Sequence, residues 1–148
     1  MIKHFETGKI FLSEFNLDSC LNRYSEFKTQ EEALKSKKIK ILSLTKCYGE
    51  DLILTWMKAW LISLSSYMDF QITPQQVNIT SRNLVEELYM LNLSEITLFF
   101  NRIIKGKYGE FYGKFNGQTI LRSALEYRSQ RGKILSGLTE SEQFEIQK

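Results

Sequence analysis

The sequence has few of the residues that hold proteins together covalently or through metals. Its 148 residues include two cysteines, Cys20 and Cys47, and one histidine, His4. These residues have no close spacing and provide too few ligands for a zinc site. A disulfide between the two cysteines stays open as an alternative, although isolated thiols are more typical of a reducing compartment. The sequence therefore predicts no metal and no cofactor.

Other absences exclude fibrous, disordered and membrane-spanning proteins. One proline and eight glycines are too few for a collagen-like or a disordered chain. Residues 1–6 lack the apolar run of a signal peptide, and Lys58 and several serines interrupt the longest apolar stretch. We therefore expect a soluble, cytoplasmic protein that does not enter a membrane.

Residues for the common catalytic mechanisms are also scarce. Nucleophilic catalysis needs a base, and His4 is a poor one so close to the terminus. Lys107 and Lys114 follow glycines, but the next residue is Tyr108 or Phe115 rather than the serine or threonine of a phosphate-binding loop. We therefore predict no catalytic residues and no enzymatic activity.

Carboxylates are numerous, but their spacing does not suit a metal. Glu86 and Glu87 are adjacent on an expected helix, so their side chains point about 100° apart. Together with Glu95 they are interpreted as solvated helix surface. The charge run from Lys35 to Lys40 is interpreted in the same way, as a solvated helix face.

Apolar residues recur at helical spacing along most of the chain, and polar residues that cap helices stand at the breaks. Alternation typical of strands is limited to residues 38–44 and 110–115. We therefore predict a mainly α fold, a single compact bundle of about five to six helices with antiparallel neighbours. The helical domain spans residues 1–133, and residues 134–148 form a tail or a short docking helix. The expected helices cover residues 17–27, the segment after Thr29, and residues 50–68, 74–91, 94–105 and 119–131.

Several residues mark the ends of these helices. Thr29 and Glu32 have capping-box spacing, and Thr73 precedes a proline that suits a first helical turn. Asn92 is a plausible stop, and Gly132 is expected to end the last main helix, which Asn116 or Thr119 caps.

The apolar positions predict which side chains form the core. Trp56 and Trp60 lie one turn apart on an apolar stripe, so we assign them to the core rather than to a ligand platform. The other expected inward positions are Ile53, Met57, Leu61, Leu64, Tyr67, Met68, Val77, Leu84, Val85, Leu88, Leu91, Ile96, Phe99, Phe100, Ile103, Ile104, Ile120, Leu121, Ala124 and Leu125.

Charge is distributed unevenly. Residues 1–100 carry 11 basic and 12 acidic side chains, whereas residues 101–133 carry 8 basic and 2 acidic ones. Within the basic segment, residues 105–117 combine four glycines, four aromatic residues and three lysines. Lysines bind phosphates, and aromatic rings stack on bases. The alternative is that the rings fold back as a hydrophobic plug between helices.

The run LNLSEITLFFNRIIKGKYGEFYGKFNGQTIL at residues 91–121, with Tyr127, Arg128 and Arg131 after it, resembles a small, mostly uncharacterised family of proteins from phages and mobile elements of Bacteroides-type bacteria. The resemblance covers approximately residues 72–131. It implies a helical protein loosely like phage replication accessory proteins and helicase loaders. The family often has an acidic residue where Asn116 stands, and the resemblance brings no catalytic residues.

The first functional hypothesis is a nonenzymatic accessory protein of phage or mobile-element DNA metabolism, which binds nucleic acid or a replication protein. The second is a protein interaction module, such as an inhibitor or adaptor of a host protein, or a self-assembling subunit that forms a homo-oligomer. The predicted binding residues are Lys105, Lys107, Tyr108, Tyr112, Lys114, Phe115, Arg122, Arg128 and Arg131.

Overall fold

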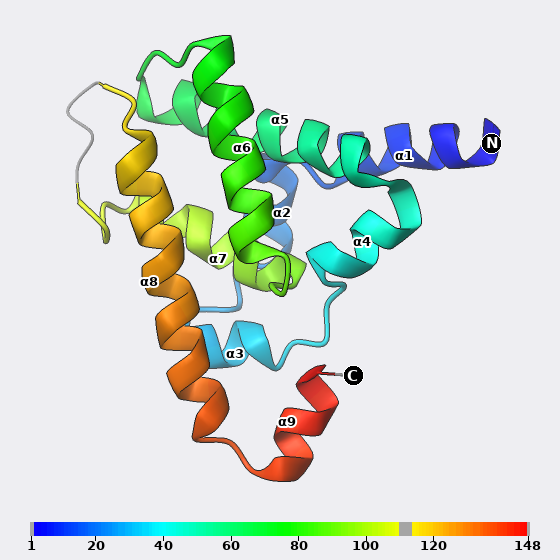
Figure 1. Ribbon diagram of the computed structural model, residues 1–148, viewed down its shortest axis with the longest axis vertical. Helices are drawn as coiled ribbons and strands as arrows, with labels where there is room; N and C mark the ends of the chain where they lie inside the picture. Colours follow the sequence, from blue (N-terminus) through cyan, green and yellow to red (C-terminus); the bar gives the residue numbers. More distant parts are fainter. Residues whose placement is uncertain (1, 110–113, 148) are drawn as a thin grey trace.

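The computed structural model describes residues 2–109 and 114–147, which form nine helices and no strand (Figure 1). The mainly α prediction is therefore confirmed, and the number of helices exceeds the five to six expected. The helices that were not expected cover Ile2–Glu14 and Ile41–Tyr48. The second has only eight residues, too few for an apolar repeat to be recognised. The helices are α1 (Ile2–Glu14), α2 (Leu17–Arg23), α3 (Gln30–Leu34), α4 (Ile41–Tyr48), α5 (Glu50–Met68), α6 (Pro74–Leu88), α7 (Leu93–Ile104), α8 (Gly117–Ser136) and α9 (Glu140–Gln147).

The helix α5 contributes the largest side chains of the core. Trp56 and Trp60 are fully buried, and both indole nitrogens donate to the carbonyl oxygen of Phe15, at 2.8 and 3.0 Å. These two bonds attach the chain between α1 and α2 to α5 and satisfy both buried indoles. The assignment of the tryptophans to the core is confirmed. Tyr67 was expected to face inward and is exposed.

Capping boxes begin both α6 and α7. Thr73 and Gln76 bond each other's backbone amides at the start of α6, and Asn92 and Glu95 do the same at the start of α7. The helix α6 ends at Leu88, earlier than expected. Asn92 was predicted only as a stop, whereas it is the residue that opens α7.

The helix α7 is surrounded by other helices. It contacts α2, α3, α5 and α8, and all residues from Leu93 to Phe100 are buried. Glu95 lies within this stretch, so its interpretation as solvated surface was wrong. Its apolar neighbours Ile96 and Phe99 are buried as predicted.

The segment Lys35–Lys40, named the lysine strap below, is not a helix face as predicted. The helix α3 ends at Leu34, and Lys37 has a φ of 60° in the left-handed region. The strap runs beside the start of α7, where Leu93 N donates to Ile39 O at 3.0 Å. The strand expected over residues 38–44 reduces to one isolated bridge, between Lys40 and Asn92, because α4 begins at Ile41.

The helices α6 and α8 pack side by side, and both begin at the same end of the molecule (Figure 1). Asn116 caps α8 as expected. Gly132 does not end this helix, which continues to Ser136, and Leu125 is 46% exposed rather than buried. None of the described helices combines the length and apolar character that a membrane crossing requires.

Candidate nucleic-acid interface

The N-termini of α6 and α8 meet at one place on the surface. The segments that lead into the two helices are joined by an isolated parallel bridge between Gln71 and Lys114. Thr73 then caps α6, and Asn116 caps α8 by accepting from Thr119 N at 3.1 Å. Because unpaired amides and the helix dipole make each N-terminus electropositive, two adjacent N-termini favour a negatively charged ligand between them.

Gly117 permits this close approach. A Cβ added at Gly117 would lie 3.1 Å from Thr80 Oγ1 and 3.3 Å from Cε1 of Phe115. These separations are shorter than ordinary van der Waals contacts, so a side chain at this position would force the side chains of Thr80 and Phe115 to shift.

Two hollows adjoin at Phe115, which lines both. One is a groove of about 420 Å³ between the first turns of α6 and α8, named the α6–α8 groove below. The other is a shallow depression of about 560 Å³ lined by Lys114 and the segment before α6, including Asp69. The α6–α8 groove is lined by Gln75, Gln76, Ile79, Thr80, Asn83, Phe115, Asn116, Gly117, Gln118 and Leu121.

Side-chain amides dominate the polar lining of this groove. The amide oxygen of Gln76 accepts from Thr73 N at 2.9 Å, and that of Asn116 accepts from Thr119 N. Because these oxygens serve the helix caps, the NH₂ groups of both residues remain as donors. Gln75, Asn83 and Gln118 add further donors and acceptors. Such a lining can bond to phosphate oxygens and to the edges of bases.

Five of the six predicted cationic residues are exposed. Four of these, Lys105, Lys107, Lys114 and Arg122, form no ion pair within the part of the chain that the structure describes. Lys114 borders the groove, and Arg122 lies one turn beyond Gln118 on α8. Lys105 and Lys107 follow directly after α7, in a segment that lies beside the N-terminal half of α8 (Figure 1).

The two predicted aromatic residues that can be placed pack against the core. The ring of Tyr108 lies 5.9 Å from that of Phe99, and the ring of Phe115 lies 5.8 Å from that of Phe70. Both are half-buried, and burial raises the pKa of Tyr108. These rings therefore act mainly as the hydrophobic plug of the alternative interpretation, with one edge of Phe115 facing the groove. Tyr112, the third predicted aromatic contact, lies outside the described residues.

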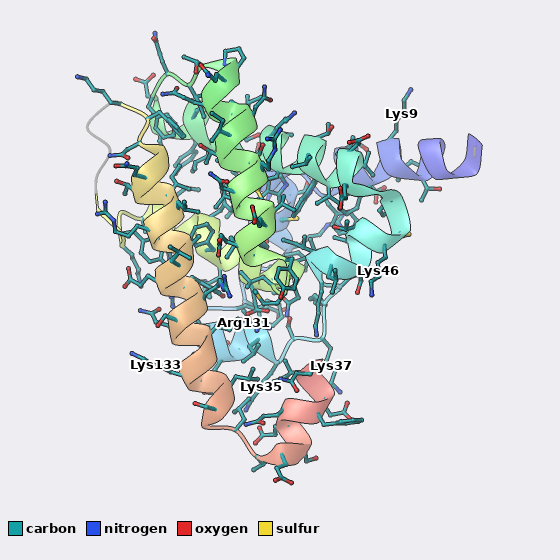
Figure 2. The ribbon with its side chains drawn as sticks, in the orientation of Figure 1. Lys9, Lys35, Lys37, Lys46, Arg131 and Lys133 are labelled. Atoms are coloured by element: carbon teal, nitrogen blue, oxygen red, sulfur yellow. The ribbon has the colours of Figure 1, made fainter. Side chains whose placement is uncertain are left out.

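The two remaining arginines already have carboxylate partners. Arg128 forms an ion pair with Glu87 on α6. Arg131 was predicted to be exposed, but it is buried and donates from Nε to Glu95 Oε2 at 2.7 Å. Figure 2 shows Arg131 on the inner side of α8 and Lys133 on its outer side. Arg131 is therefore excluded from the interface, and Arg128 would have to break an ion pair to join it.

The buried carboxylate of Glu95 accepts several hydrogen bonds. Its Oε1 accepts from Asn92 N at 3.1 Å, and Arg131 also donates to Met90 O at 3.4 Å. Burial raises the pKa of Glu95, because desolvation outweighs the lowering by Arg131 and Asn92. Burial likewise raises the pKa of the nearby Tyr127. This network joins α3, α7 and α8 and supports the helices that carry the groove, since Asn92 Nδ2 also donates to Ala33 O at 3.0 Å.

Sequence reasoning missed the amides of the groove. Gln75, Gln76, Asn83 and Gln118 carry no motif, and they become one surface only because α6 and α8 start side by side. The available signal was the recurrence of amide residues in the first turns of two capped helices. The described residues contain no group of three or more histidine, cysteine, aspartate or glutamate side chains able to hold a metal ion.

Comparison with known proteins found a family model that is similar to part of the chain. Residues 72–143 match a family described as a "Family of unknown function (DUF6633)". The matched stretch contains all of α6, α7 and α8, and hence the whole α6–α8 groove. No curated protein and no solved structure matches the chain.

Proposed function

We propose that this chain is a nonenzymatic, cytoplasmic accessory protein of phage or mobile-element DNA metabolism, and that it binds single-stranded nucleic acid at the α6–α8 groove. The observation that carries the proposal is the meeting of two helix N-termini beside Lys114, in a groove lined by amide donors. A phosphate at this point would face the positive ends of two helix dipoles and a lysine ammonium.

The other cations extend this surface. Further phosphates of a strand bound between the helix N-termini could pair with Arg122 on α8 and with Lys107 in the segment beside it. Each exposed cation that pairs with a phosphate releases a counterion, which makes the binding strongly salt-dependent. Asp69 is the only acidic side chain among the described residues that line the groove and the depression, and it limits the path on that side.

The amides supply the second part of the interaction. Gln75, Asn83 and Gln118 can donate and accept, so they suit the polar edges of unpaired bases, and the exposed edge of Phe115 offers an apolar contact. A flat stacking platform is not part of this proposal, because Tyr108 and Phe115 are largely held by the core. We therefore expect modest affinity with little sequence preference.

The test is the binding of a fluorescently labelled single-stranded oligonucleotide to the full chain. Lys107→Glu with Lys114→Glu should weaken binding by at least roughly 100-fold at low salt, because two attractive contacts become repulsive. The matched control, Lys28→Glu with Lys46→Glu, changes the net charge equally at exposed positions away from the groove and should change binding far less. Equal losses in the two variants would show that net charge alone attracts the strand.

A second candidate function, a protein interaction module, is favoured by the apolar residues on the same face. Ile79 is 53% exposed beside the groove, and Leu125 lies one turn from Leu121 on α8. A partner protein or a second copy of the chain would cover this row. Mass measurement in solution with and without the oligonucleotide separates the two functions, since an oligomer indifferent to nucleic acid favours protein interaction.

A further inference from the structure

A second basic groove lies at the opposite end of α8, between the lysine strap and α9. It has a volume of about 530 Å³. Figure 2 shows Lys35 and Lys37 of the strap close to α9. Strap residues and Ser43 of α4 line one side of the groove, and Ser141, Glu142, Glu145 and Ile146 of α9 line the other.

The helix α9 occupies one side of this groove through a few polar contacts. Glu142 Oε2 lies 2.9 Å from Lys35 Nζ, and Lys40 Nζ donates to the carbonyl oxygen of Ile146. At the end of α8, Gln143 Nε2 donates to Leu135 O at 2.8 Å. Glu142 also caps α9, because its other oxygen accepts from the amide and the hydroxyl of Thr139.

These contacts hold α9 loosely. None of its described residues is buried, and Phe144 is 66% exposed. The Lys35–Glu142 pair is exposed on both sides, and such pairs contribute little to stability. The helix can therefore leave the strap without uncovering a hydrophobic core.

The strap contains two lysines that form no ion pair with the described carboxylates of α9. Lys37 and Lys38 line the groove, and neither has a carboxylate partner within the described residues. Leu34 and Ile39 give the same groove an apolar floor. A surface that combines lysines with an apolar floor fits a helix whose facing side carries both carboxylates and an apolar residue. The helix α9 presents such a side, since Glu142, Glu145 and Ile146 line the groove.

We propose that the lysine strap is a docking site for an acidic helix of a partner protein, whose facing side carries an apolar residue among its carboxylates, and that α9 occupies this site from within the chain until such a helix displaces it. The apolar floor favours a helix over a nucleic acid as the occupant, because Leu34 and Ile39 are aliphatic and offer no ring on which a base could stack. This inference goes beyond the proposed function, since it uses a different surface and different lysines.

The probe is a labelled peptide with the sequence of residues 138–148 of this chain, added to the full-length protein. The variant Glu142→Gln with Gln143→Ala weakens the internal contacts, while the glutamine at 142 can still cap α9. This variant should bind the peptide about tenfold more tightly than the native chain, because a larger fraction of molecules has an open strap. The further change of Lys37→Glu with Lys38→Glu should lower that affinity by tenfold or more. The matched control, Lys105→Glu with Lys107→Glu, should leave it within about twofold.

Failure of the peptide to bind the variant with weakened contacts would overturn the proposal, as would equal losses in the strap and control variants. An oligonucleotide that binds the strap, while the peptide does not, would assign this surface to nucleic acid instead. Circular dichroism establishes whether each variant is folded. If Lys37→Glu with Lys38→Glu does not fold, Lys37→Gln with Lys38→Gln takes its place, because it removes both charges without reversing them. Strap variants should leave oligonucleotide binding at the α6–α8 groove unchanged, so either proposal can fail without the other.

Discussion

Arg131 on α8 donates from its Nε to Oε2 of Glu95 on α7 at 2.7 Å, and both side chains are buried. Glu95 is at the same time the residue that closes the capping box of α7. One carboxylate therefore fixes where α7 begins and how α8 lies across it. Since α8 also forms one wall of the α6–α8 groove, this buried pair supports the geometry of the proposed interface.

The buried pair predicts a large loss of stability when only its cation is removed. Arg131→Met leaves Glu95 buried without its main partner, which should lower the free energy of unfolding by about 3–5 kcal/mol. Glu95→Gln added to this variant removes the buried charge while an amide can still close the capping box, so the double variant should recover much of the loss. Urea unfolding measures all three proteins. A single variant as stable as the native chain, or a double variant no better than the single one, would contradict this role.

Gly117 predicts opposite effects for two glycine substitutions on α8. Gly117→Ala forces the new methyl group against Thr80 and Phe115 and should cost roughly 1–2 kcal/mol, with weaker oligonucleotide binding. Gly132→Ala, whose Cβ meets nothing within 4 Å, should gain about 0.5–1 kcal/mol, because alanine is the better helix former. Thermal unfolding of the two variants provides the comparison. Stabilisation by Gly117→Ala would show that the helices do not approach as closely as described.

The contact between α9 and the strap predicts a dependence on pH. The bonds from Lys35 and from the Thr139 amide lower the pKa of Glu142 below its ordinary value. A lowered folded-state pKa means that the contact contributes above the ordinary glutamate pKa and is lost as the pH falls through the lowered one. The bonds to Glu142 and Glu31 raise the pKa of Lys35, so this partner stays charged throughout the acid range.

The α9 contact should therefore persist at neutral pH and weaken in acid. An NMR titration of the Glu142 carboxyl carbon measures its pKa directly. Lys35→Gln should move this pKa upward, toward the ordinary glutamate value. No change in the variant would mean that Lys35 does not hold α9.

The helices that were predicted well are those whose signals are local. Thr73 with Pro74 marks the start of α6, and the apolar stripe of α5 places Trp56 and Trp60 in the core. These features depend on residues three or four positions apart, so they can be recognised without knowledge of the tertiary structure.

The errors concern residues whose environment is set by distant parts of the chain. Arg131 and Glu95 are 36 positions apart, and only the crossing of α7 and α8 shows that their charges neutralise each other. The strap has the composition of a solvated helix, but its backbone follows the start of α7 instead. In the same way, the groove amides became a site only through the pairing of α6 with α8. The sequence can therefore reveal a basic segment, but it cannot show which of its cations are free of carboxylate partners and available to bind a ligand.

The salt dependence of single-stranded oligonucleotide binding tests the central proposal most directly. With four available cations, Lys105, Lys107, Lys114 and Arg122, the logarithm of the affinity should fall with the logarithm of salt concentration with a slope of about −3, at about −0.7 per phosphate contact. Removing two of them by Lys107→Glu with Lys114→Glu should make the slope shallower, at about −1.4 or closer to zero. Binding that is insensitive to salt, or a slope that is unchanged in the double variant, would contradict a nucleic-acid interface at the α6–α8 groove.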